Sequence, residues 1–129
     1  MNIHDREALY RELRCVLKPG ARLAFYDALA GDAKPDVFYP TPWAETAATS
    51  ALMNEAETRA VLKASAFEVQ SWEDVTKEAA GWLSQQRPAL PGGGPGLVVG
   101  PRIGEMVANF GRNLKEGRLR LVMAVCDAV

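Results

Sequence analysis

An acidic residue at the end of an apolar run is the first candidate for chemistry in this chain. Asp27 follows residues 23–26, an apolar run with little alternation that is typical of a strand covered on both faces. In an open α/β sheet, Asp27 would lie at the carboxyl edge, where such folds place their ligands. A carboxylate there can serve a ligand, or it can only cap the strand end through a hydrogen bond. The sequence leaves both interpretations open.

Aromatic residues between prolines form the second candidate. Residues 28–50 have the Gly, Pro, Asp and Thr content of a loop, yet Phe38, Tyr39 and Trp43 lie at its centre. One interpretation is a flap that covers apolar core surface. The other is a lid whose rings shape a small-molecule pocket beside Asp27. The two interpretations are compatible.

Other residue types that often carry chemistry give weaker signals. His4 is the only histidine, and its position before the first predicted helix is more typical of a surface or capping residue than of a catalyst. Cys15 and Cys126 have no Cys or His at metal-ligand spacing, so no metal site is predicted. The glycine-rich run at residues 91–96 lacks the Lys-Ser/Thr of a phosphate-binding loop. We predict a flexible connection there rather than an anion site.

Composition predicts one globular domain. With 129 residues, 48% hydrophobic and 24% charged, residues 1–129 can bury a core as a single domain. Fifteen basic and sixteen acidic side chains are scattered along the chain, which argues against nucleic acid or an anionic membrane as a partner. No basic-then-apolar leader and no membrane-length apolar run occur, so we predict a cytoplasmic location.

The elements that position these residues are read from periodicity and caps. Asp5 is placed to cap a first helix, and Pro19 and Gly20 to end it before the strand at residues 23–26. The apolar stripe of that helix is Leu9, Leu13, Val16 and Leu17. A capping pair, Asn54 and Glu57, predicts a second helix.

The remaining elements follow in the second half of the chain. Residues 67–72 alternate as a strand with one wet face, and a shorter helix follows within residues 73–86. A strong helix then runs from Pro101 to the turn at Gly117, and residues 119–125 form the last strand. On the last helix, the polar positions Asn109, Arg112 and Asn113 could face a ligand, but we expect them to face solvent. The predicted class is α/β.

This order of elements resembles the C-terminal half of class I S-adenosylmethionine (SAM)-dependent methyltransferases. The resemblance rests on the helix, the Leu-Lys-Pro-Gly turn, the strand ending in Tyr-Asp, and a final strand after a long insertion. Residues 39–44 (Tyr-Pro-Thr-Pro-Trp-Ala) and 109–118 (Asn-Phe-Gly-Arg-Asn-Leu-Lys-Glu-Gly-Arg) are similar to the branch that includes sarcosine and dimethylglycine methyltransferases. The resemblance implies a partial Rossmann-like fold, with flanking helices and a three-stranded mixed sheet. In this sheet the last strand lies antiparallel between the other two.

The resemblance also implies a function and a set of roles. The complete family enzymes transfer a methyl group from SAM to a small-molecule acceptor. By this similarity Asp27 is catalytic, orienting the acceptor or taking its proton. Tyr26, Tyr39 and Trp43 bind the substrate as aromatic walls that suit a cationic acceptor.

The SAM-binding motif of the family is absent from the sequence. A glycine-rich turn after the first strand and an acid at the end of the second strand hold SAM in the family, and neither is found here. No residue is therefore assigned as a SAM ligand, and we expect the chain alone to bind no cofactor and not to catalyse methyl transfer. Met1 falls where the family's fourth strand has just ended, so we expect a truncated open reading frame, an internal start or a deliberately expressed half.

Two alternatives to a methyltransferase fragment remain open. One is a non-catalytic homo-oligomerising or interaction module with a methyltransferase-derived core. The other is an unrelated α/β ligand-binding domain, which a parallel final strand would favour. Because the strand at residues 23–27 would lack its family neighbour, we also expect a homodimer joined through that bare edge or the adjoining helices.

Overall fold

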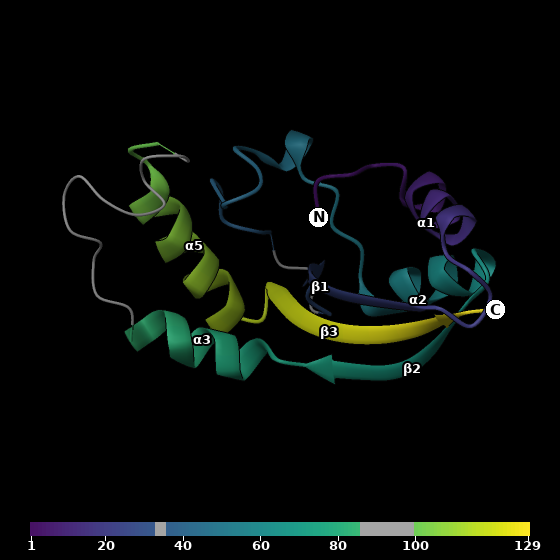
Figure 1. The fold of residues 1–129 in the computed structure, drawn as a ribbon. Coiled ribbons are helices and arrows are strands. Elements are labelled where there is room, and N and C mark those ends of the chain that lie inside the picture. The colour runs from purple at the N-terminus through teal and green to yellow at the C-terminus, as the bar shows by residue number, and fades with distance from the viewer. Residues whose placement is uncertain (33–35, 86–99) are drawn as a thin grey trace.

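The computed structural model describes residues 1–32, 36–85 and 100–129, which form helices packed on a small β-sheet (Figure 1). In chain order the elements are α1 (Arg6–Val16), β1 (Arg22–Ala30), the short 3-10 helix η1 (Ala47–Thr49), α2 (Glu55–Ala64), β2 (Phe67–Asp74), α3 (Thr76–Gln85), α5 (Ile103–Lys115) and β3 (Leu119–Ala128). The glycine-rich run at residues 91–96 lies outside the described residues. The predicted α/β class is confirmed.

The sheet has the strand order β1-β3-β2 among the described residues. β3 runs antiparallel to both neighbours, so the predicted position of the last strand between the other two is confirmed. The expectation of a mixed sheet is wrong, because both pairs of adjacent strands are antiparallel. β1 and β2 run in the same direction, but β3 lies between them. An antiparallel β3 also removes the argument for an unrelated domain with a parallel final strand.

Local signals at the ends of the helices act as predicted. The Asp5 carboxylate accepts a hydrogen bond from the Ala8 N–H at 2.8 Å. Asn54 and Glu57 form a reciprocal capping box, with bonds of 2.9 and 2.8 Å at the start of α2. Gly20 and Gly117 adopt φ values of 77° and 69°, which reverse the chain before β1 and β3. Each signal needs only neighbours in sequence.

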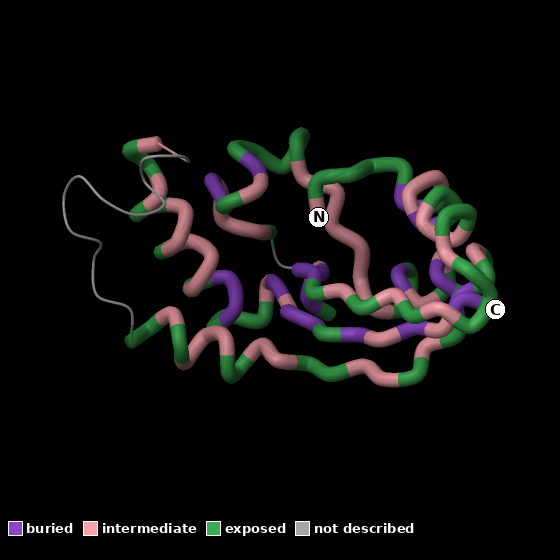
Figure 2. The backbone as a smooth tube through the Cα atoms, viewed as in Figure 1, coloured by how far each residue is buried: buried purple, intermediate pink, exposed green. Residues whose placement is uncertain are grey.

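The helices bury two different parts of the sheet. α1 and α2 cover one face, where Tyr10, Leu62, Phe67 and Cys126 form a buried cluster. Burial raises the pKa of the Tyr10 phenol and of the Cys126 thiol, so both stay neutral near pH 7. Another cluster lies beside α3 and α5, and its buried members are Ala28, Leu114, Leu119 and Leu121. Because strand residues alternate, Ala28 and Leu121 face the side of the sheet opposite to Phe25 and Cys126. Figure 2 shows buried backbone at both ends of the sheet.

The expectation that residues 23–26 are covered on both faces is wrong. Leu23 and Phe25 pack against the cluster under α1 and α2, but Ala24 is exposed and Tyr26 is 55% exposed. The physical reason is that α3 and α5 cover only the half of the opposite face that contains Ala28. An unbroken apolar run therefore does not mean equal burial on its two sides.

Gly31 lies against the backbone of Gly117, and its replacement by alanine is expected to destabilise the protein by about 1–3 kcal/mol. Its N–H donates to the Arg118 carbonyl at 2.9 Å, and an added Cβ would overlap the Gly117 carbonyl oxygen and lie 2.9 Å from its carbon. The matched control is Gly111→Ala inside α5, where an added Cβ meets nothing within 4 Å. That change is expected to stabilise by about 0.5–1 kcal/mol. Urea unfolding of both variants checks the opposite signs.

Candidate functional site

A cavity of about 890 Å³ opens where β1 ends, α2 begins and β3 begins. Its wall includes Gly31, Asp32, Tyr39, Glu55, Arg118 and Arg120. The residues come together because the carboxyl end of β1 and the first residues of the antiparallel β3 meet at the same edge of the sheet. A hollow of this kind can hold a small molecule, and the ligand site at this edge stays a prediction.

Carboxylates surround a guanidinium beside this cavity. An Arg120 Nη2 lies 2.6 Å from Asp32 Oδ2, and the carboxylates of Glu55 and Asp74 lie 3.9 and 3.8 Å from other nitrogens of Arg120. Glu55 also pairs with Arg59 Nε at 2.8 Å. Of the described residues that line the cavity, four are acidic and three are arginines. The wall therefore carries a slight excess of negative charge.

Asp27 is engaged in a buried ionic cluster and does not line this cavity. It is 8% exposed, and its Oδ2 lies 3.0 Å from an Nη2 of Arg6, which is also 8% exposed. Its Oδ1 lies 3.3 Å from the Met1 amino group, whose pKa burial lowers, and accepts the Ala28 N–H at 2.9 Å. Both oxygens thus have partners in the described structure. The catalytic assignment stays a prediction, and these contacts favour a structural role.

The predicted aromatic walls lie in different places. Tyr39 lines the cavity. Tyr26 points to the face of the sheet opposite to Asp27, because consecutive strand residues alternate. The Trp43 ring packs edge-on against Phe110, with ring centroids 5.5 Å apart, and its indole N–H donates to Ser50 Oγ at 3.2 Å. The structure therefore brings none of Tyr26, Trp43 and Asp27 to the cavity wall beside Tyr39.

The aromatic loop, here residues 36–44, is fastened to α5 by residues that the sequence analysis placed at the solvent. Asn113 is 0% exposed; its Oδ1 accepts the Phe38 N–H and its Nδ2 donates to the Phe38 carbonyl, each at 2.9 Å. Asn109 Nδ2 donates to the Pro40 carbonyl at 3.1 Å. The spacing of Asn109 and Asn113 in the sequence could have indicated this shared role, because residues i and i+4 lie on the same face of a helix.

Arginines complete this attachment. The guanidinium groups of Arg112 and Arg118 lie 3.7 and 4.2 Å from the centre of the Phe38 ring. Such contacts add attraction between a cation and the face of an aromatic ring. Phe38 is thus held by its backbone and its ring, and Tyr39 follows directly. The loop is a fixed part of the cavity wall and also covers core surface, so the flap interpretation is confirmed for Trp43.

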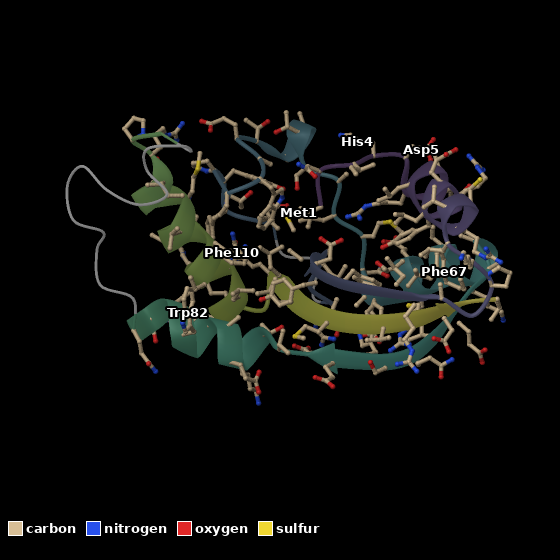
Figure 3. All side chains as sticks on the ribbon, in the orientation of Figure 1. Met1, His4, Asp5, Phe67, Trp82 and Phe110 are labelled. Atoms are coloured by element: carbon tan, nitrogen blue, oxygen red, sulfur yellow. The ribbon has the colours of Figure 1, made fainter. Side chains whose placement is uncertain are left out.

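The remaining single residues give no further site. His4 is exposed before α1, as Figure 3 shows, and Cys15 is also exposed. Within residues 1–32, 36–85 and 100–129, no group of three or more His, Cys, Asp or Glu side chains could hold a metal ion. In the same ranges, no helix combines the length and apolar character needed to cross a membrane.

Comparison with solved structures identifies the fold. The chain matches geranyl diphosphate C-methyltransferase from Streptomyces coelicolor A3(2), solved with Mg²⁺, geranyl diphosphate and S-adenosyl-L-homocysteine, with a TM-score of 0.71 and 14% identity over 100% of this chain. It also matches a putative sarcosine dimethylglycine methyltransferase from Galdieria sulphuraria, with a TM-score of 0.67 and 12% identity over 99% of this chain. No family model and no curated protein sequence matches.

The fold is therefore that of part of the class I SAM-dependent methyltransferases, as the resemblance predicted. The two matches cover 44% and 49% of the solved chains, so this chain spans about half of their length. A third solved structure with this fold, mycolic acid cyclopropane synthase CmaA1, matches with a TM-score of 0.65 and 13% identity, and this chain covers 54% of it. At these identities the likeness concerns architecture.

Proposed function

We propose that this chain is the acceptor-binding part of a small-molecule SAM-dependent methyltransferase. The observation that supports this most directly is the match of the whole chain to part of solved methyltransferases, with a cavity at the carboxyl end of β1. In methyl transfer, a protein contributes mainly by holding the acceptor in line with the donor and by excluding water. The cavity wall would supply the first of these contributions.

The chain's own residues do not fit SAM. Among the described residues no glycine-rich turn borders the cavity, and the first turn of α2 presents Glu55 and Glu57 there, whose negative charges would repel the carboxylate of the donor. We therefore assign SAM binding to polypeptide outside residues 1–129, and methyl transfer by this chain alone is not part of the proposal.

The acceptor we propose is a small amine. Asp32 and Glu55 place carboxylates at the cavity, and Tyr39 adds an aromatic face. These carboxylates now pair with Arg120, and the ligand would exchange these partly exposed ion pairs for its own: its amine would take the carboxylates and its carboxylate would take Arg120. A protonated or methylated amine is attracted to both carboxylates and aromatic faces. An N-methylated amino acid matches this set of groups at both of its ends.

Nuclear magnetic resonance titration tests this acceptor class with a matched pair of probes. Dimethylglycine and 3-methylbutanoate have nearly the same shape, and only the first carries a cationic nitrogen. We expect dimethylglycine to shift backbone resonances of residues on the cavity wall, and 3-methylbutanoate to shift them several-fold less. Tyr39→Leu should weaken the response more than Tyr39→Phe, because phenylalanine keeps the aromatic face. Equal responses to the two probes, or none at millimolar concentration, would contradict the proposal.

A second candidate is a non-catalytic oligomerising module that uses the same fold. The uncovered half of the sheet face at Tyr26 and Met123 favours it. Calorimetric titration with dimethylglycine separates the candidates, because a purely oligomerising module is expected to give no heat of binding.

A further inference from the structure

The cavity at the end of β1 is much larger than dimethylglycine. Its volume of about 890 Å³ lies in the upper part of the range of about 300–1,000 Å³ that is typical of sites for drug-sized ligands. Dimethylglycine carries its amine and its carboxylate on one carbon and has no side chain. The groups that would bind its two ends belong to one part of the wall, so most of the wall would not touch it.

The charged part of the wall lies on one side of the sheet edge. Arg120 points to the same side of β3 as Cys126, because alternate residues of a strand share a face. Cys126 belongs to the buried cluster under α1 and α2, so Arg120 points to that face. Asp32, and Glu55 at the start of α2, place their carboxylates within ion-pair distance of Arg120. The amine and the carboxylate of an amino acid would therefore be held on this side.

The apolar part of the wall lies on the other side. Val37 and Leu52 line the cavity and also pack against the buried cluster that contains Leu121. Leu121 follows Arg120 in β3 and therefore points to the opposite face of the sheet. Ala30, the last residue of β1, also lines the cavity. The hollow thus extends around the end of β1 from a charged side to an apolar side.

Backbone contacts hold the apolar side in place. The Ala30 N–H donates to the carbonyl of Met53, the residue after Leu52, at 2.9 Å. Val37 precedes Phe38, whose backbone is fastened to α5 by two hydrogen bonds of 2.9 Å. Both apolar side chains therefore project from backbone that is already fixed, and a ligand that touches them does not have to order a loop.

Charged residues beside Val37 already have partners. Arg118 Nε lies 2.7 Å from a carboxylate oxygen of Glu116, and the Arg118 guanidinium lies 4.2 Å from the centre of the Phe38 ring. The same guanidinium donates to the Asp36 carbonyl. An uncharged part of a ligand leaves these contacts intact, whereas a charged part would compete with them. This side of the cavity therefore suits an apolar group.

We propose that the acceptor is an N-methylated amino acid with an apolar side chain at least as large as that of leucine, and that Val37 and Leu52 form the subsite for this side chain. The inference rests on the proposed function, because it takes both charged ends of the acceptor to lie on the Arg120 side. With those ends held, the substituent on the α-carbon is the group that can reach the apolar side. Its contact with Val37 and Leu52 removes apolar area from water, which favours binding.

Calorimetric titration of the full chain compares dimethylglycine with the two enantiomers of N,N-dimethylleucine, which carry the same amine and carboxylate. We expect one enantiomer to bind about tenfold more tightly than dimethylglycine, as for partial burial of a leucine side chain. The other enantiomer should gain less, because a fixed wall lies on one side of the α-carbon only. Equal affinities of the enantiomers, or no gain over dimethylglycine, would overturn the subsite and leave the proposed function standing. If none of the three probes binds, the proposed function fails as well.

A matched pair of truncations locates the subsite. Leu52→Ala is expected to reduce the preference for dimethylleucine over dimethylglycine several-fold. Leu83→Ala makes the same truncation at a partly buried leucine of the same cluster, but Leu83 does not line the cavity, so the preference should be unchanged. The preference is a ratio of two affinities of one variant, so a loss of stability common to both variants cancels. An unchanged preference in Leu52→Ala, or an equal fall in both variants, would overturn the proposal.

Discussion

Asp27→Ala is expected to lower the free energy of unfolding by about 3–5 kcal/mol, the range for breaking a buried ion pair by removing one partner. The variant leaves the Arg6 guanidinium without its carboxylate in a site where both side chains are about nine-tenths buried. It also frees the outward Ala28 N–H that Asp27 now binds. Urea unfolding followed by circular dichroism measures the loss.

A double replacement distinguishes pairing from packing at this site. Arg6→Met with Asp27→Leu removes both charges and keeps the volume, so it is expected to be much less destabilising than Asp27→Ala alone. Arg6 Nε is already buried without a partner in the described structure, which makes loss of the charged pair less costly. A loss below about 1 kcal/mol for Asp27→Ala would contradict the structural role and favour the catalytic one.

The sequence predicted best what depends on neighbours in the chain. Asp5 and the Asn54 and Glu57 pair cap helices because their side chains reach amides three residues away. Gly20 and Gly117 reverse the chain because glycine alone reaches positive φ without strain. These interactions have the same geometry in any fold, so they can be read without knowing what lies nearby.

The sequence predicted least well what depends on distant elements. Whether one side of β1 is covered depends on how far α3 and α5 extend over the sheet, which no residue of β1 specifies. Asn113 appeared polar and therefore solvent-facing, but the aromatic loop lies against it and uses both ends of its amide. The separation of Tyr26 from Asp27 is a different case, because it could have been predicted from the sequence. Consecutive residues of a strand point to opposite faces of the sheet.

Asp27 links several of these features. Its Oδ2 holds α1 through Arg6, and its Oδ1 accepts the N–H of Ala28 in β1. A substitution there would therefore loosen the helix that covers β1 and leave this N–H without its partner. The same carboxylate thus holds a helix and a strand together.

Asn113→Ala is expected to destabilise the protein by about 2–4 kcal/mol, because it leaves the N–H and the carbonyl of Phe38 unpaired and a small cavity in α5. Asn109→Ala is the matched control on the same helix face. Asn109 makes a single, partly buried bond to the Pro40 carbonyl, so its loss should be about 0.5–1 kcal/mol.

Amide hydrogen exchange at Phe38 shows whether the loop itself is released in Asn113→Ala. This N–H is bonded to Asn113 Oδ1 in the native structure, so its exchange should accelerate strongly in Asn113→Ala and little in Asn109→Ala. Because Tyr39 follows Phe38 at the cavity wall, a released loop should also weaken the response to dimethylglycine. If Asn113→Ala were as stable as Asn109→Ala and protected Phe38 equally, α5 would not hold the loop through this amide.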